Sequence, residues 1–434
     1  MTIADLPESW DAETEVLIIG AGACGLVAGL AAGEAGAEVL IVERDASPSG
    51  STALSSGFIP AAGTIAQKAL EIEDSPELFA ADIQQKANDG AHPGITATAT
   101  QNIGPALDWL AQNHGLNWHV LDDFLYPGHS RHRMHAVPEK TGAGLMARLI
   151  AASEGAGLTR VNDAQTTTLH VEGQRILGVT VARPDGVTET IRANAVILAC
   201  NGYGANTEMV ARHIPEIAAA PYFGHPGNTG DAVSWGLALG AKVRDLTAYQ
   251  GHGSLAHPHG ILITWALMME GGIQVNARGE RFSNEILGYS EQGVAVLTQP
   301  GGIAWNIYDA RLHELGMTFP DYRDAMAVGA VLQGDTAALS ERIGIEETAL
   351  IATLADCAAC CDGAADKFGR DFTAVPVLGP DLYAIRVTGA LFHTQGGLVV
   401  DADARVIGDD GTPFPNLWAG GGAACGVSGS SVEG

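Results

Sequence analysis

The stretch EVLIIGAGACGLVAGLAAGEAGAEVLIVER, residues 15–44, decides the fold. It begins with a short apolar run typical of a buried strand, continues through an Ala- and Leu-rich helix to about residue 35, and ends in a second apolar strand at residues 37–44. Glycines with G-x-G-x-x-G spacing stand where the first strand meets the helix, and Glu43 follows about 20 residues later. In this context the β-α-β unit predicts a dinucleotide-binding site.

The three glycines and the acid each have a physical role in such a unit. Gly20 makes the tight turn, Gly22 lets the backbone approach a pyrophosphate, and Gly25 allows the helix to pack closely on the strand. The N-terminus of the helix offers free N–H groups to the phosphates. Glu43 would accept hydrogen bonds from a ribose, and a purely structural turn would not require an acid at that position.

The rest of the chain predicts one domain interrupted by another. Residues 49–64 are small and hydroxyl-rich, typical either of an ordinary loop or of a loop running under a flat cofactor. Helices and loops are expected at about 65–150, and strands separated by turn signals at 159–200. Residues 255–372 are rich in helical, Ala-rich segments and read as an insertion, after which strand character returns.

Composition excludes several classes of protein. The 434 residues carry a net charge of −27, which argues against nucleic-acid binding and is typical of a highly soluble protein or a high-salt host. The sequence contains no run of about 18 apolar residues, so no membrane span is predicted. The acidic N-terminal stretch lacks the basic and apolar regions of a signal peptide. Six cysteines without a paired framework suit a reducing cytoplasm, and CAACC at 357–361 lacks the partner motif of a metal site, so we expect no metal.

Six segments together resemble one flavoprotein family. They are VLIIGAGACGLVAGLAAGEAGAEVLIVER, GSTALSSG, NTGDAVSWGLALGA, GGIQVNARGERFSNE, HTQGGLVVDADARVI and LWAGGGAACGVSG. In this order they are similar to fumarate reductases, succinate dehydrogenases and 3-ketosteroid dehydrogenases. The resemblance implies an α/β fold in which a Rossmann-like FAD-binding domain, residues 1–254 and 373–434, is interrupted by a mobile α+β capping domain, residues 255–372.

The resemblance also implies how FAD is held. Members that attach FAD covalently carry a histidine in the segment matching GSTALSSG, and this chain has none there, so we expect non-covalent FAD. Family members continue beyond the last motif into a helix that faces the flavin, whereas this sequence ends at Gly434. The predicted cofactor contacts are Gly20, Ala21, Gly22, Ala23, Cys24, Gly25, Glu43, Arg44, Ser51, Thr52, Ser55, Ser56, Gly57, Val161, Ala199, Asn201, Gly202, Asp231, His393, Gly420, Gly421, Ser428 and Val432.

The active-site pattern departs from that of a fumarate reductase. The reductases carry a proton-donating arginine four residues after the glutamate of RFxNE, where this chain has Tyr289. Their carboxylate-binding glutamate and arginine match Trp265 and Met268, and a C-terminal arginine matches Val432. Binding two carboxylates requires cations, so the loss of three arginines disfavours a dicarboxylate substrate.

Other positions match a ketone site. His252, Thr264 and His393 retain the substrate-binding histidines and threonine of the reductases. Ketosteroid dehydrogenases place a tyrosine where Tyr289 stands, and it serves as the base that removes a proton next to a ketone. Tyr126 lies roughly where those enzymes have a second tyrosine. A phenol with a pKa near 10 needs a donor or a cation to ionise at neutral pH. The alternative is that Tyr289 only packs its ring.

These residues predict an FAD-dependent oxidoreductase acting on a CH–CH bond α,β to a carbonyl. The preferred reaction is desaturation of a small, cyclic, ketone-like substrate with Tyr289 as base and the flavin as hydride acceptor. One alternative is the reverse reaction, reduction of an enone or enoate. Another is an electron-transfer flavoprotein subunit with a degenerate site, against which His252, Thr264 and His393 speak. The electron partner is not specified by the sequence.

Overall fold

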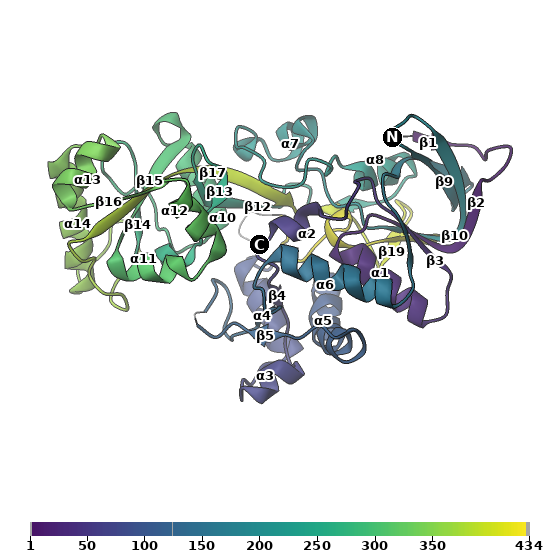
Figure 1. Cartoon of the computed structure of the whole chain (residues 1–434), viewed down its shortest axis with the longest axis horizontal. Helices are drawn as coiled ribbons and strands as arrows, with labels where there is room; N and C mark the ends of the chain where they lie inside the picture. The colour runs from purple at the N-terminus through teal and green to yellow at the C-terminus, as the bar shows by residue number, and fades with distance from the viewer. Residues whose placement is uncertain (1, 124, 431–434) are drawn as a thin grey trace.

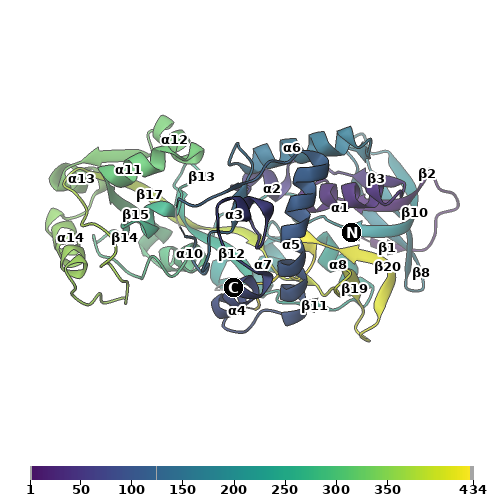
Figure 2. The same cartoon turned by 90° about the horizontal axis from the view of Figure 1, so that it is seen from below.

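The computed structural model describes residues 2–123 and 125–430. One β-sheet with its covering helices forms one end of an elongated molecule, and a second sheet with its own helices forms the other end (Figure 1). A bundle that contains α3, α4 and α5 lies below the junction in Figure 1 and near the middle of the molecule when it is seen from below in Figure 2. The arrangement confirms the predicted α/β class.

The first sheet has nine strands and joins both ends of the chain. Its order is β1-β8-β9-β10-β2-β3-β7, and β20 pairs with β10 and with β19. β10, β2, β3 and β7 run parallel, whereas β8, β9 and β10 form an antiparallel meander. The strands are β1 (Thr2–Ala4), β2 (Ala12–Ile19), β3 (Val39–Val42), β7 (Thr159–Val161), β8 (Gln165–Glu172), β9 (Arg175–Ala182), β10 (Thr188–Leu198), β19 (Arg405–Ile407) and β20 (Pro413–Ala419).

The opening stretch forms the parallel core of this sheet, as the sequence predicts. Leu17, Ile18 and Ile41 are fully buried, because helices and the antiparallel meander cover both faces of the strands. α1 (Ala23–Glu34) packs beside α6 (Gly142–Gly155) over one face. A Cβ on Gly25 would stand 1.9 Å from the carbonyl oxygen of Gly20, so only glycine permits this approach of helix to strand.

The excursion predicted at about 65–150 is mainly helical. It packs against α1 through one shared core and carries a small three-stranded sheet in the order β4-β6-β5. Its elements are α2 (Gly50–Leu54), β4 (Ile59–Pro60), α3 (Ile65–Ala69), α4 (Pro76–Lys86), α5 (Pro93–His114), β5 (His119–Val120) and β6 (Met134–Ala136), and α6 closes it. The following segment adds α7 (Thr207–His213), α8 (Asp231–Ala238) and β11 (Val243–Arg244), which pairs with β18 (Gly397–Leu398).

The second sheet has six strands around the long strand β17 (Leu382–Thr394). β12 (Tyr249–Ala256), β15 (Ile303–Asp309) and β16 (Val331–Gly334) all pair antiparallel with it. β13 (Ile261–Leu262) and β14 (Ile273–Val275) extend the edges, and the covering helices are α9 (Ala266–Met269), α10 (Tyr289–Leu297), α11 (Ala310–Met317), α12 (Pro320–Ala327), α13 (Thr336–Ile343) and α14 (Glu347–Cys361). The strands of this sheet thus reach beyond residues 255–372 on both sides, and the domain boundaries at 254 and 372 stay a prediction.

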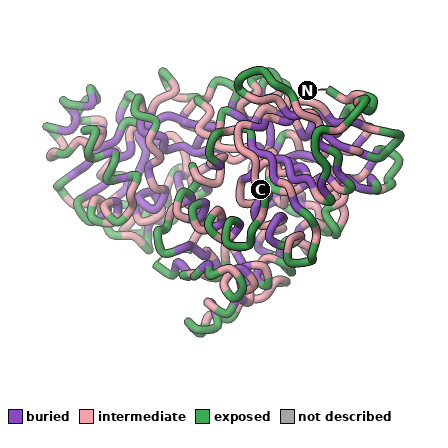
Figure 3. Tube along the Cα trace, turned by 45° about the vertical axis from the view of Figure 1, so that its right-hand side comes forward, coloured by how far each residue is buried: buried purple, intermediate pink, exposed green. Residues whose placement is uncertain are grey.

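Separate apolar cores stabilise the two ends of the molecule. Buried segments run through both sheets, while the outer turns are exposed (Figure 3). The CAACC segment lies in α14, where Cys357 and Cys360 are buried in the second core as free thiols. Within residues 2–123 and 125–430, no cluster of His, Cys, Asp and Glu has the arrangement of a metal site. No helix in that part of the chain combines the length and the apolar character needed to cross a membrane.

Candidate active site

The junction of β2 and α1 forms the floor of one cavity. Gly20 has a left-handed φ of +106°, and a Cβ there would lie 2.6 Å from the carbonyl oxygen of Ala199. At Gly22, by contrast, a Cβ would meet no atom closer than 3.8 Å, so its backbone is open to the cavity. The buried Glu43 carboxylate accepts hydrogen bonds from the N–H groups of Ala21 at 2.8 Å and Asp45 at 3.0 Å. The acid is therefore held at the end of β3, beside the glycine turn.

The cavity has a volume of about 260 Å³ and is lined by many of the predicted cofactor residues. These are Gly20, Gly22, Ala23, Cys24, Glu43, Arg44, Ser51, Thr52, Ala199, Asn201, Asp231 and Gly421. Small residues, an acid and the open N-terminus of a helix are the groups that a dinucleotide requires. The residues present therefore fit the adenosine and pyrophosphate part of FAD.

The remaining predicted cofactor residues lie around this cavity or beyond it. The carbonyl of Val161 accepts the N–H of Glu43 at 2.9 Å, and Gly420 donates to the carbonyl of Leu198 at 3.1 Å, so both extend the strand pairing. Ala21, Gly25, Gly202 and Ser428 do not line the cavity, and Ser55, Ser56, Gly57 and His393 line a neighbouring one. Val432 lies outside the described residues.

Several residues that line the first cavity were not among the predicted cofactor contacts. Asn228 donates a hydrogen bond to Ser51 at 2.8 Å, and His225 lies 2.7 Å from the carboxylate of Asp45. Ala164, Gln165, Thr166, Trp235 and Gly422 also line the wall. Asn228, Trp235 and Gly422 stand in the segments NTGDAVSWGLALGA and LWAGGGAACGVSG, so the family resemblance was the signal that could have found them. Ala164, Gln165, Thr166 and His225 lie in none of the six segments.

A second cavity, of about 650 Å³, brings the predicted catalytic residues together. Tyr126, His252, Thr264, Tyr289 and His393 all line it. Its wall is mainly apolar and aromatic, with Phe58, Phe223, Leu262, Trp265, Met269, Phe319 and Phe392. Its charged residues are Lys140 and Asp321, and no arginine is among the lining residues that the structure describes. Ser51 lines both cavities, so a ligand with a flavin at one end and an adenosine at the other can extend from one to the other.

Trp265 and Met268, which match the carboxylate-binding glutamate and arginine of the reductases, are packed as apolar side chains. Trp265 lines the second cavity and is packed in the core of the second sheet. Met268 is 1% exposed and does not line the cavity. Neither position offers a charge, and among the described lining residues the one Lys or Arg is Lys140, whose exposed side chain lies 4.0 Å from Asp123.

His252 lies at the centre of an aromatic stack. Its ring lies 5.3 Å from the ring of Tyr289 and 5.2 Å from that of Phe392, at interplanar angles of 19° and 14°. Its Nδ1 accepts the backbone N–H of Ser254 at 3.1 Å. Burial lowers the pKa of His252 to about 3, so the ring is neutral at physiological pH. A neutral ring whose Nδ1 is an acceptor carries its proton on Nε2, which makes His252 an uncharged hydrogen-bond donor.

His393, near the end of β17, is also neutral. Burial lowers its pKa below the ordinary histidine value. Its Nε2 contacts the side-chain oxygen of Gln250 on the neighbouring strand β12, at 2.5 Å. This contact fixes the ring at the wall of the second cavity.

Tyr289 is the first residue of α10, and its environment differs from the sequence-based expectation. Burial, together with the nearby charge of Glu291, raises the pKa of the phenol. Burial and the proximity of Tyr289 also raise the pKa of Tyr126. A base would require a cation or donors that lower the pKa, so the phenol is protonated at neutral pH in this state of the protein.

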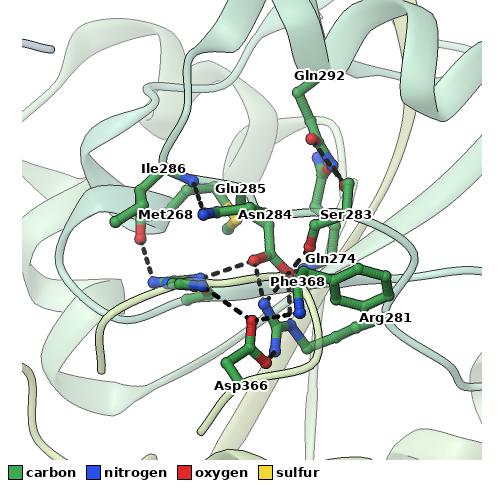
Figure 4. A network of polar contacts seen from close by, with 12 residues as sticks. Met268, Gln274, Arg281, Ser283, Asn284, Glu285, Ile286, Gln292, Asp366 and Phe368 are labelled. Atoms are coloured by element: carbon green, nitrogen blue, oxygen red, sulfur yellow. Dashed lines mark hydrogen bonds and ion pairs between the residues drawn. The ribbon is translucent and has the colours of Figure 1, made fainter. Parts of the chain in front are cut away.

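A buried ionic network anchors the segment that precedes Tyr289 (Figure 4). The Arg281 guanidinium donates to both oxygens of Glu285, at 2.8 and 2.7 Å, and to Asp366 at 2.6 Å. Arg370 donates to Glu285 at 3.0 Å and to the Met268 carbonyl at 2.7 Å. The RFSNE motif thus ties the start of α10 to the segment carrying Trp265.

Comparisons with known proteins agree with this geometry. A family model described as FAD binding domain matches residues 15–434. The chain is 29% identical to a probable fumarate reductase of Shewanella frigidimarina over 423 residues, which cover 96% of this chain and 71% of the relative.

Two solved structures are similar over almost the whole chain. The open conformation of a flavocytochrome c3 fumarate reductase has a TM-score of 0.83 at 27% identity, covering 97% of this chain and 75% of that one. The 3-ketosteroid-Δ4-(5α)-dehydrogenase of Rhodococcus jostii, in complex with 4-androstene-3,17-dione, has a TM-score of 0.76 at 25% identity, covering 98% and 93%. The match to the family model over nearly the full length decides the family: the chain belongs to the FAD binding domain family and is an FAD-dependent oxidoreductase acting on CH–CH bonds.

Proposed function

We propose that the protein desaturates the carbon–carbon bond α,β to the carbonyl of an uncharged, cyclic ketone. The observation that carries this proposal is the composition of the second cavity. Tyr126, His252, Thr264, Tyr289 and His393 line it together, its wall is otherwise mainly apolar, and no arginine lines it among the described residues. Such a wall favours a neutral ring compound over a dicarboxylate, because Lys140, exposed and 4.0 Å from Asp123, is the one Lys or Arg among the described lining residues and cannot partner two buried carboxylates.

The side chains that line the second cavity have different roles in the proposed reaction. Neutral His252 presents an Nε2–H donor that can polarise a ketone oxygen, and Thr264 and His393 lie on the same cavity wall. Polarisation makes the α-proton acidic, and Tyr289, as phenolate, would accept that proton. Bound FAD supplies the acceptor for the hydride that leaves the β-carbon.

The test is anaerobic mixing of the oxidised holoenzyme with a panel of cyclic ketones, from cyclohexanone to 3-ketosteroids. We expect bleaching of the flavin absorbance and formation of the α,β-enone. Fumarate and succinate are the controls and should give no turnover. Brisk turnover of either, or a panel in which no ketone reduces the flavin, would contradict the proposal.

The reverse reaction, reduction of an enone, is a second candidate. It is favoured by one observation, the raised pKa of Tyr289, because a protonated phenol is ready to deliver a proton to the α-carbon. Mixing the reduced holoenzyme with cyclohex-2-enone distinguishes the two directions. Reoxidation much faster than flavin reduction by the corresponding ketone would assign the protein to reduction.

We also propose that FAD is bound without a covalent link. The loop that lines the cavity carries Ser51 and Thr52 and contains no histidine from Gly50 to Gly57. Acid or heat denaturation should therefore release FAD into the supernatant. Flavin that stays with the denatured pellet would contradict this proposal.

A further inference from the structure

A smaller cavity adjoins the second cavity of the candidate active site, which we call the substrate cavity. It has a volume of about 160 Å³. Pro127, Gln250 and Tyr289 line both cavities, so these residues form the wall between them. We call the smaller space the inner cavity; its titratable lining residues are Asp82, Lys86, His129, Tyr249, Tyr289 and Glu291. Tyr289 therefore has the substrate cavity on one side and a polar cavity on the other.

The inner cavity leads toward the surface. A third, more open cavity of about 500 Å³ shares Asp82, Lys86, Gly128, His129 and Glu291 with it. The side chains of Lys86 and Glu291 are 31% and 20% exposed and are joined by an ion pair of 2.5 Å. This pair links α4 to α10, which lie on the two sides of the domain junction (Figures 1 and 2). The path from Tyr289 to solvent thus passes Glu291.

The inner cavity is suited to water. The side-chain oxygen of Gln395 and the Nδ1 of His129 are buried and have no hydrogen-bond partner among the described residues, and both residues line this cavity. Buried polar atoms are nearly always hydrogen-bonded, to protein or to water. A volume of about 160 Å³ exceeds the roughly 10–15 Å³ that one water requires. Ordered water between Tyr289 and Glu291 would satisfy these atoms.

Among the acids of the inner cavity, Glu291 is the one suited to carry a proton. Asp82 pairs with the fully buried Arg133 at 2.5 Å and accepts the backbone N–H and the hydroxyl of Ser130, both at 2.8 Å, whereas Glu291 pairs with Lys86, whose side chain is 31% exposed. Burial and the charge of Arg133 lower the pKa of His129 to about 4, so its ring is neutral and a poor proton acceptor. Glu291 follows Tyr289 by two residues on α10. It lines both the inner cavity and the third, more open cavity.

We propose that Glu291 is a proton relay between Tyr289 and solvent. The inference rests on the proposed function, and Glu291 acts through Tyr289 without touching substrate. In desaturation, the α-C–H bond breaks and its proton forms the O–H bond of Tyr289, while the hydride leaves with the flavin. The phenol then gives that proton to water in the inner cavity, the water passes one to the Glu291 carboxylate, and the carboxylic acid releases it to bulk solvent. In the reverse reaction the same groups carry the proton inward.

The test uses the Glu291→Gln holoenzyme, which keeps the size of the side chain and an oxygen for Lys86. Turnover of cyclohexanone, or of the first ketone of the panel that reduces the flavin, is followed with an artificial electron acceptor. Because the direct acid–base group contributes about 10²–10⁴-fold, we expect kcat to fall by about 10- to 100-fold with little change in KM. Raising the acetate concentration at constant pH and ionic strength should restore the rate of this variant and leave the wild-type rate unchanged.

Lys86→Gln is the matched control. It removes the ion pair between α4 and α10 but leaves the Glu291 carboxylate. Because the carboxylate that carries the proton remains in place, kcat should stay within about twofold of wild type. Equal losses in both variants without rescue by acetate would show that the pair only holds the domains together, and an unchanged Glu291→Gln enzyme would also overturn the relay. A wild-type enzyme that oxidises no ketone contradicts the proposed function instead.

Discussion

At the scale of single residues, the site is defined by neutral side chains. Burial keeps His252 and His393 uncharged and keeps the phenol of Tyr289 protonated. The residue types and positions were predictable from motifs, since each stands at a fixed distance from a recognisable segment. The direction of the Tyr289 pKa shift was not, because it depends on burial by residues distant in the chain and on the charge of Glu291, two residues further along α10.

A first prediction concerns His393. Its Nε2 lies 2.5 Å from the Gln250 side-chain oxygen; if a substrate carbonyl replaces that oxygen, His393→Ala should retain FAD and lose about 10²–10³ in the rate of flavin reduction by a ketone, as is typical when one donor to a developing oxyanion is removed. Stopped-flow absorbance measures this rate. His259→Ala, at an exposed histidine, is the control and should behave as wild type. Unchanged kinetics in His393→Ala would give His393 a packing role only.

A second prediction concerns pH. The reactive form for desaturation is the phenolate, and burial raises the pKa of Tyr289 above its ordinary value of about 10. The rate of flavin reduction by ketone should therefore rise across pH 7 to 10 without reaching a plateau. Enone reduction uses the phenol, which predominates over this whole range, and its rate should show no such rise. A plateau for desaturation below pH 8 would contradict the raised pKa.

At the scale of elements, the sequence predicted local strand and helix patterns but not the pairing of strands that are distant in the chain. The unit β2-α1-β3 was predictable because its strands, turn and helix are contiguous and each has its own periodicity. The membership of β12 and β17 in one sheet was not apparent, because their paired residues are separated by more than a hundred positions and no local feature marks the partner. This is why the six-stranded sheet extends beyond residues 255–372.

A third prediction concerns the helix–strand contact. Gly25→Ala would place a Cβ 1.9 Å from the carbonyl oxygen of Gly20, so α1 must move away from β2. We expect loss of FAD binding or of soluble folded protein, measured by flavin content after gel filtration. Gly155→Ala, at the end of α6 with no atom within 4 Å of the added Cβ, should leave both unchanged. A Gly25→Ala protein with full flavin content would refute the close approach.

A fourth prediction concerns the buried network around Glu285. Arg281 and Glu285 are nearly inaccessible, with side chains 4% and 0% exposed. Arg281→Ala leaves Glu285 with Arg370 alone and removes the guanidinium that pairs with Asp366, so it should lower the free energy of unfolding by about 3–5 kcal/mol, measured by denaturant titration. The exposed pair Arg278–Glu280 is the control, and Arg278→Ala should cost about 1 kcal/mol or less. Similar decreases in the free energy of unfolding in both variants would show that burial of the network does not contribute to stability.

At the scale of the whole molecule, the substrate cavity draws on two distant parts of the chain. Tyr126 and the Ser51 loop come from the N-terminal part, whereas Thr264 and Tyr289 come from the part that forms the six-stranded sheet and its helices. The motifs predicted that these segments belong to one site, because the order of the segments is typical of the family. They did not predict the inner cavity, which requires α4 and α10 to lie together across the domain junction.

The measurement that tests the central claim most directly is flavin reduction by a cyclic ketone in wild type and in Tyr289→Phe, by stopped flow at saturating substrate across pH 7 to 10. Phenylalanine keeps the ring that stacks on His252, so the fold and FAD content should be unchanged. If the hydroxyl transfers the proton, the variant should lose about 10²–10⁴ in rate and the rise of the rate with pH should disappear. A Tyr289→Phe enzyme that reduces its flavin at the wild-type rate, with the same pH dependence, would contradict the account.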